Sequence, residues 1–342
     1  MKVLVIRTSA MGDVALVTPV IKSMSIQHPD TELVILTRPP FESFYYSFSG
    51  VTVFSADFKG RYSGLTGMSR VFHDLRKKYR FDHVIDLHDV IRSRLIRWMF
   101  GMTGVRVTVI DKGRSEKRSL LDGSRKVKLI HSVERYYNAF AKAGFPLERS
   151  EGPWIVPRPE GISRAENLLR EKELLHIGVA PLAKHGLKMW PEKNMISLME
   201  MIAKYKKVRF WLFGGKEETP QLISMQNRIP ESVLIAGTLS LDEELAIISR
   251  LKFMISMDSS NMHMAALSGT KVISIWGGTD PLAGFGAWHQ PDEYSIRIPV
   301  EDLTCRPCTV YGKGTCRRGD FACMDRLKPE MVFEKIIEIG LL

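Results

Sequence analysis

The stretch Phe253–Leu267, FMISMDSSNMHMAAL, decides how this chain folds and where it binds a ligand. Its first residues form an apolar run typical of a buried strand, and its last residues follow a helical pattern. Asp258, Ser259 and Ser260 make the turn between them, and His263 lies just inside the helix. Because the first backbone N–H groups of a helix have no partner within it, such a turn favours an anion such as phosphate. The stretch therefore predicts a phosphate-binding strand–turn–helix unit. The alternatives are serines that only cap the helix and a His263 that belongs to the core.

Three further motifs follow strand-like segments in the same half of the chain. Lys188-Met189-Trp190-Pro191 places a cation before a helix begun by proline, so Lys188 could neutralise a diphosphate or remain a solvated surface lysine. Glu218, after Gly214-Gly215, could accept hydrogen bonds from a ribose or belong to a simple turn. Gly278 and Thr279 lie in another glycine-rich turn. Together these turns indicate a nucleotide site.

Strand-like and helix-like segments alternate along the whole chain, which predicts an α/β protein with parallel sheets and helices on both faces. The alternation breaks at residues 150–161, where three prolines and two glycines indicate a linker. We therefore expect two doubly wound domains facing a cleft, residues 1–155 and the part from residue 156 onward. Ligands of such sheets bind at the carboxyl ends of the strands, where the motifs lie.

The first strand ends in Arg7-Thr8-Ser9-Ala10-Met11-Gly12-Asp13. This turn has a single glycine, so the dinucleotide fingerprint G-x-G-x-x-G is absent. Asp13 begins the following helix. It is either an acid favoured by the helix dipole or a carboxylate that takes a proton from an acceptor hydroxyl.

The composition limits the possible partners and compartment. The chain has 342 residues, a net charge of +11 and 44% apolar residues, enough for two cores. The positive charge favours phosphorylated metabolites or anionic lipid surfaces, unless it reflects solvated basic helices. No nucleic-acid motif is recognised, so we expect no nucleic-acid partner. Neither a membrane-spanning run nor a signal peptide is visible, which favours the cytoplasm.

All four cysteines lie late in the chain: Cys305, Cys308, Cys316 and Cys323. Four thiolates can bind a structural zinc ion, but the last two spacings are not those of a standard zinc knuckle. Reduced cysteines packed as small apolar residues are the alternative, and it is the one we expect.

The order and spacing of these motifs resemble those of the family 9 glycosyltransferases, the lipopolysaccharide heptosyltransferases and their relatives. The resemblance runs nearly end to end and rests on Ser9–Val14, Lys188–Pro191, Asp258–His263, Gly278–Pro281 and the cysteine-rich tail. It implies the GT-B fold of two Rossmann-like domains, with the acceptor in residues 1–155 and the donor in residues 156–328. It also implies that a final helix in residues 329–342 packs back on the first domain.

The resemblance also implies roles for individual residues. Asp13 is similar to the family's general base, and Lys188 to the residue that stabilises the departing diphosphate. The expected donor-binding residues are Glu218, Asp258, Ser259, Ser260, His263, Gly278 and Thr279. The expected acceptor-binding residues, in the opening motif, are Arg7, Ser9, Met11 and Gly12. Ser260 departs from the family, which commonly has glycine there.

We therefore expect an inverting glycosyltransferase that uses neither metal nor cofactor and takes a nucleotide-sugar donor, ADP-heptose. The expected acceptor is a lipid-linked inner-core intermediate of lipopolysaccharide at the cytosolic face of the inner membrane. The basic helix 68–79 and Arg92, Arg94 and Arg97 are expected to approach its phosphates or anionic lipids. The alternatives are a transferase using another nucleotide-hexose, a nucleotide-sugar epimerase and a non-catalytic sugar-nucleotide-binding protein. The sequence specifies neither the base and sugar of the donor, nor the acceptor, nor the oligomeric state.

Overall fold

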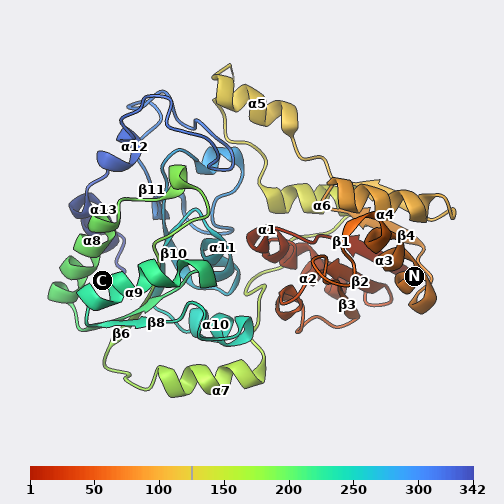
Figure 1. Ribbon diagram of the computed structural model, residues 1–342, viewed down its shortest axis with the longest axis horizontal. Coiled ribbons are helices and arrows are strands. Elements are labelled where there is room, and N and C mark those ends of the chain that lie inside the picture. The colour runs from red at the N-terminus through yellow and green to blue at the C-terminus, as the bar shows by residue number, and fades with distance from the viewer. Residues whose placement is uncertain (125) are drawn as a thin grey trace. The chain divides into compact units, whose positions relative to one another are not determined.

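The computed structural model describes residues 1–124 and 126–342. They form two compact units (Figure 1). Unit 1 comprises Met1–Lys112 and Ser132–Val156, and unit 2 comprises Gly113–His131 and Pro157–Leu342. The two-domain prediction and its division near residue 155 agree with these units, apart from the segment Gly113–His131.

Unit 1 is built on a five-stranded sheet in the order β3-β2-β1-β4-β5, in which every described pairing is parallel. The central strand β1 is an apolar run whose residues Val3–Ile6 are fully buried. The strands are β1 (Lys2–Ile6), β2 (Glu32–Thr37), β3 (Val51–Ser55), β4 (His83–Asp86) and β5 (Arg106–Val109). The α-helices are α1 (Met11–Ala15), α2 (Thr18–Gln27), α3 (Gly64–Lys78), α4 (Ile91–Gly101) and α6 (Ser132–Lys142).

The helix pattern after β1 is divided into α1 and α2. Pro19 lies in the first turn of α2, where its missing N–H costs nothing. The same proline inside one continuous helix would remove a hydrogen bond. The division leaves Asp13 in a one-turn helix directly after the strand.

Unit 2 is built on a six-stranded sheet in the order β11-β10-β9-β6-β7-β8, again parallel in every described pairing. The strands are β6 (Leu175–Ala180), β7 (Val208–Leu212), β8 (Ser232–Leu234), β9 (Phe253–Met257), β10 (Lys271–Ile275) and β11 (Ser295–Ile296). The α-helices are α5 (Arg114–Asp122), α7 (Pro159–Leu168), α8 (Glu192–Tyr205), α9 (Thr219–Arg228), α10 (Leu241–Ile248), α11 (Ser260–Leu267), α12 (Ala322–Asp325) and α13 (Pro329–Glu338).

Helix α5 differs from the expectation that residues 1–155 form one domain. The chain leaves unit 1 after Lys112, adds α5 to unit 2 and returns at Ser132. Leu120 and Leu129 pack there against Ala283 and Val310 in a small core of their own. A backbone hydrogen bond from Leu129 N–H to Leu282 O (2.8 Å) fixes the segment that leads back to unit 1.

The C-terminal helix α13 also differs from the expectation. We expected residues 329–342 to pack back on the first domain, but the structure places α13 in unit 2, against α8. Val332 and Ile336 are fully buried in the main core of that unit. Their spacing of four residues makes one apolar stripe, and α8 offers a matching apolar face.

The expected linker, residues 150–161, is partly helical, because α7 begins at Pro159. None of the helices in the described part of the chain combines the length and apolar composition needed to cross a bilayer.

Candidate functional site

The predicted anion site lies at the carboxyl end of β9. The strand ends at Met257, and Ser259 is the N-cap residue of α11. Its hydroxyl lies 3.2 Å from the Ser256 hydroxyl, and the Ser259 side chain does not cap the helix. The first N–H groups of a helix have no carbonyl partner within it, and the helix dipole favours an anion there.

Lys188 and Asp258 meet at this turn. The Lys188 Nζ lies 2.7 Å from Asp258 Oδ2, and only 16% and 6% of the two side chains is exposed. Lys188 ends a short 3-10 helix, Gly186–Lys188, that follows the β6 strand end. His263, in the first turns of α11, is buried. The structure thus brings together Lys188, Asp258 and the start of α11, as the sequence predicts, and places His263 on the same helix.

Glu218 closes a turn at a neighbouring strand end. Its Oε2 accepts a hydrogen bond of 2.6 Å from Gly215 N–H. This contact organises the loop after β7. One carboxylate oxygen is thus already engaged, and a ribose contact by Glu218 stays a prediction.

Gly278 and Thr279 are buried rather than open at the site. The N–H of Gly278 donates to Leu187 O at 2.8 Å, and its carbonyl accepts from Cys308 N–H at 3.0 Å. The turn therefore holds the Lys188 loop through the backbone of Leu187. Direct donor contacts by Gly278 and Thr279 stay predictions.

The four cysteines are free thiols that line a single cavity of about 10 Å³ beside Leu187 and Gly278. Burial raises the pKa of Cys308 and raises that of Cys323 to about 11, so both favour the neutral thiol. Within residues 1–124 and 126–342, no three His, Cys, Asp or Glu side chains are grouped so as to hold a metal ion.

Asp13 lies at the carboxyl edge of the unit 1 sheet. Its Oδ2 is 2.9 Å from Arg7 Nη2, and 30% of its side chain is exposed. Arg7 is buried and donates from Nη1 to Leu87 O at 2.6 Å. The Tyr136 hydroxyl donates to the backbone carbonyl of Asp13 at 3.2 Å. Arg7 and Tyr136 therefore fix the position of a carboxylate that a substrate can still reach.

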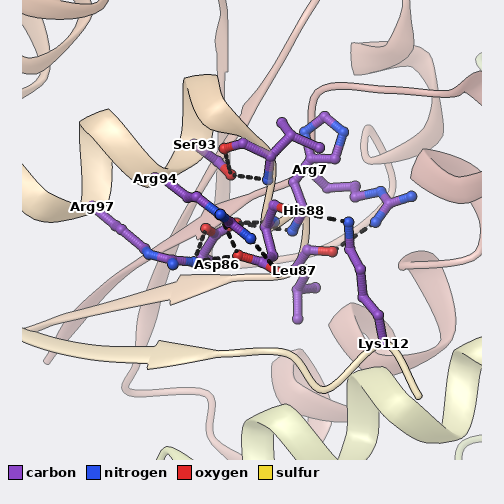
Figure 2. A network of polar contacts seen from close by, with 10 residues as sticks. Arg7, Asp86, Leu87, His88, Ser93, Arg94, Arg97 and Lys112 are labelled. Atoms are coloured by element: carbon purple, nitrogen blue, oxygen red, sulfur yellow. Dashed lines mark hydrogen bonds and ion pairs between the residues drawn. The ribbon is translucent and has the colours of Figure 1, made fainter. Parts of the chain in front are cut away.

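His88, which our sequence reasoning missed, joins the same edge from the loop after β4 (Figure 2). Its ring nitrogens lie 3.0 Å from the Thr8 hydroxyl and 3.3 Å from the Ser9 hydroxyl. Burial, with the Arg7 and Lys112 charges nearby, lowers the pKa of His88 to about 3. His88 is therefore neutral at physiological pH and holds Ser9 in place. Its position directly after a strand was the signal that could have found it.

The arginines of α4 have a different role from the expected one. Arg94 and Arg97 are ion-paired with Asp89 at 2.9 and 3.1 Å, and Arg97 also contacts Asp86 at 2.7 Å (Figure 2). Arg92 stacks over the Phe58 ring at 4.4 Å. The expectation that these cations approach acceptor phosphates finds no support for Arg94 and Arg97. Their carboxylate partners are Asp86, the last residue of β4, and Asp89 in the loop that follows, so the two arginines hold that loop.

Unit 2 also carries a basic groove of about 510 Å³ between α5 and the loop after Val310. Lys117 Nζ lies 4.6 Å from the centre of the Phe285 ring, so an aromatic side chain lies next to one of these cations. The groove is lined by Arg114, Lys117, Arg118 and Arg317, with Leu121, Asp122, Val310 and Tyr311. Sequence reasoning missed it because α5 was not predicted.

Comparisons with known proteins agree on one family. The model of glycosyltransferase family 9 (heptosyltransferase) matches residues 68–313. Lipopolysaccharide heptosyltransferase 1 of Escherichia coli is 23% identical, with 89% of this chain and 95% of that protein covered. The enzyme of the same name from Pseudomonas aeruginosa is 24% identical, with 97% and 96% covered.

Solved structures show the same fold. A family 9 glycosyltransferase from Veillonella parvula superimposes with a TM-score of 0.79 at 17% identity, covering 99% of this chain and 97% of that one. E. coli heptosyltransferase WaaC with ADP gives 0.70 at 19% identity, covering 99% of each chain. The predicted fold class, α/β with the two parallel-sheet domains of the GT-B fold, is confirmed. The chain belongs to glycosyltransferase family 9 and is a glycosyltransferase.

Proposed function

We propose that this enzyme transfers heptose from ADP-heptose to an inner-core acceptor of lipopolysaccharide, with inversion and without a metal ion. The observation that carries the proposal is the Lys188–Asp258 pair, with the two charged atoms 2.7 Å apart at the uncapped start of α11. A cation beside a helix N-terminus is suited to a diphosphate that gains charge as it leaves.

The proposed reaction assigns one role to each unit. The acceptor hydroxyl oxygen attacks the anomeric carbon of the donor sugar, and Asp13 takes the hydroxyl proton. The bond from the anomeric carbon to the diphosphate oxygen breaks, and the electron pair leaves with ADP. Lys188 and the α11 N–H groups stabilise the charge that develops on the leaving group. Attack opposite to the leaving group inverts the anomeric centre, and the transition state resembles an oxocarbenium ion.

The donor and acceptor are inferred from the relatives and from charge. The matched curated proteins are named lipopolysaccharide heptosyltransferases. Solved neighbours hold ADP or ADP-2-deoxy-2-fluoro heptose. The basic groove beside α5 and the net charge of +11 suit a phosphorylated, lipid-linked acceptor. The enzyme would meet it by peripheral contact with the cytosolic face of the inner membrane.

Release of ADP from ADP-heptose, measured with and without a lipopolysaccharide inner-core acceptor, tests the proposal. We expect release that depends on acceptor in the wild-type enzyme. The Asp13→Asn variant, which keeps the shape of the side chain, should lose about 10²–10⁴-fold in turnover while keeping its ADP affinity.

Three outcomes would contradict the proposal at different points. Turnover of Asp13→Asn within a few-fold of wild type would exclude Asp13 as the base. ADP release that ignores the acceptor would indicate another reaction, such as epimerisation or hydrolysis. Activity with another nucleotide-hexose and none with ADP-heptose would keep the transferase but replace its donor.

A further inference from the structure

We propose that Gly312, in the cysteine-bearing loop 305–323, positions Lys188 for its action on the donor diphosphate. This inference rests on the function proposed above, because it gives a role to the loop only if Lys188 acts there. It explains a sequence motif that the reaction itself does not use.

The first observation is direct contact between Gly312 and the stem of Lys188. A Cβ atom built on Gly312 would lie 2.6 Å from Lys188 Cγ and 2.8 Å from Cε, far inside ordinary van der Waals contact. Because Gly312 has no side chain, the space beside it is occupied by the methylene groups of Lys188. Since the Nζ atom is 2.7 Å from Asp258 Oδ2, the side chain is held along its stem and at its tip.

The second observation is that the loop carrying Gly312 is anchored to the interior of unit 2. Arg306 is 1% exposed, and its Nε donates to Gly277 O at 2.7 Å and its Nη2 to Thr279 O at 3.1 Å. The same guanidinium donates to Ile298 O and lies 3.2 Å from Asp280, whose carboxylate is fully buried. A buried charge with this many partners is costly to displace.

The anchored turn also reaches Lys188 through the backbone. Gly278 receives a hydrogen bond from Cys308 N–H (3.0 Å) and donates one to Leu187 O (2.8 Å), the residue before Lys188. The loop therefore supports the backbone of Lys188 from one side and its side chain from the other. A lysine side chain has large rotamer freedom. If it is already ordered before the donor binds, the reaction does not have to supply the entropy cost of ordering it.

The test compares Gly312→Ala with Gly314→Ala. Both glycines have positive φ values, +79° and +99°, so alanine brings backbone strain at each. Only Gly312 has Lys188 within reach, since nothing lies within 4 Å of a Cβ at Gly314. ADP affinity by calorimetry, turnover and thermal midpoint are measured for both variants. We expect Gly312→Ala to lose about 10- to 100-fold in turnover, as a misplacement of about 1 Å can cause, and Gly314→Ala to stay within a few-fold of wild type.

The same two substitutions in a Lys188→Ala background complete the test. If Gly312 acts through Lys188, Gly312→Ala should have no further effect on ADP affinity or turnover there. Equal effects of the two glycine variants, or an undiminished effect of Gly312→Ala without Lys188, would overturn the inference alone. No effect of Lys188→Ala itself would instead overturn the proposed role of Lys188. If Gly312→Ala does not fold, the pair Gly312→Asn and Gly314→Asn serves the same comparison, because asparagine tolerates positive φ better.

Discussion

Three carboxylates at the carboxyl edge of the unit 1 sheet show how surroundings separate one acid from another. Asp86 is fully buried and accepts hydrogen bonds from the N–H groups of His88 and Asp89. The side chain of Asp89 is 10% exposed and forms ion pairs with the guanidinium groups of Arg94 and Arg97. Asp13 keeps 30% of its side chain exposed. Of the three, Asp13 is the one a substrate can best reach, and this supports its assignment as the base.

The low pKa of His88 predicts a contribution to acid stability. His88 is neutral in the folded protein down to about pH 3, whereas an unfolded histidine binds a proton near its ordinary pKa of 6.5. The unfolded state therefore holds more protons between these values, and stability falls as the pH is lowered from 6.5 toward 3. One such group contributes at most about 1.4 kcal/mol per pH unit.

His88→Gln should reduce the slope of unfolding free energy against pH between pH 3 and 6.5, by at most the amount that corresponds to one bound proton. Urea unfolding of wild type and variant at pH 7 and pH 5 measures the difference. An unchanged slope of unfolding free energy against pH would show that His88 does not have the low pKa. At pH 7 the variant also reports how much the contacts to Thr8 and Ser9 contribute.

At the scale of elements, the strand-to-helix turns were the part that sequence could predict. Periodicity placed β1, β9 and α11 to within a residue or two, and the rule that ligands bind at strand ends then brought Lys188 and Asp258 together. Helix α5 was missed because it is short and mostly polar, with one fully buried residue, Leu120. The Arg306 contacts were not predictable either, since most of their acceptors are backbone carbonyls, which leave no pattern of residue types.

The turn between β9 and α11 predicts a separation of binding from stability. Lys188→Ala and His263→Gln should each weaken ADP binding by about 1–3 kcal/mol, the value of a charge-assisted hydrogen bond. The thermal midpoint of the unliganded protein should change little for His263→Gln, whereas Lys188→Ala should also lower it, because it leaves the buried Asp258 carboxylate without its ion-pair partner. Lys193→Ala is the matched control, because Lys193 is an exposed lysine in the first turn of α8, five residues along the chain.

Calorimetry with ADP and a melting curve on each variant decide the matter. A His263→Gln protein that melts earlier but binds ADP normally would identify His263 as a core histidine without a ligand role. If Lys193→Ala loses as much ADP affinity as Lys188→Ala, the loss reflects the net positive charge of the protein and not a contact made by Lys188.

At the scale of the whole molecule, two segments belong to a different unit from the one expected: α5 lies within residues 1–155, and the family resemblance implied that α13 packs on the first domain. Both α5 and α13 complete cores of unit 2. Sequence order could not predict this for α5, because a short amphipathic helix fits any exposed apolar face of suitable width, whereas for α13 sequence order was right and the resemblance was not. For α13 the assignment predicts that its buried stripe matters to stability.

Ile336→Ala in α13 should lower the free energy of unfolding by about 2–5 kcal/mol, the usual cost of emptying a buried site. Met331→Ala on the same helix is the control, since that side chain is 46% exposed and should change stability by about 0.5 kcal/mol or less. Denaturant unfolding of the two variants provides the measurement. Equal, small effects would mean that α13 is not part of the unit 2 core.

The last prediction concerns the source of positive charge for the leaving diphosphate. In the proposed reaction Lys188 and the first N–H groups of α11 supply it, within a chain of net charge +11. Transfer should therefore survive EDTA and dialysis. Elemental analysis should find well under one zinc per chain, and four free thiols should react under denaturing conditions. A requirement for added magnesium or manganese would remove the argument for Lys188 as the charge stabiliser. Stoichiometric zinc with transfer unaffected by EDTA would leave that argument intact and assign the metal to the cysteine loop.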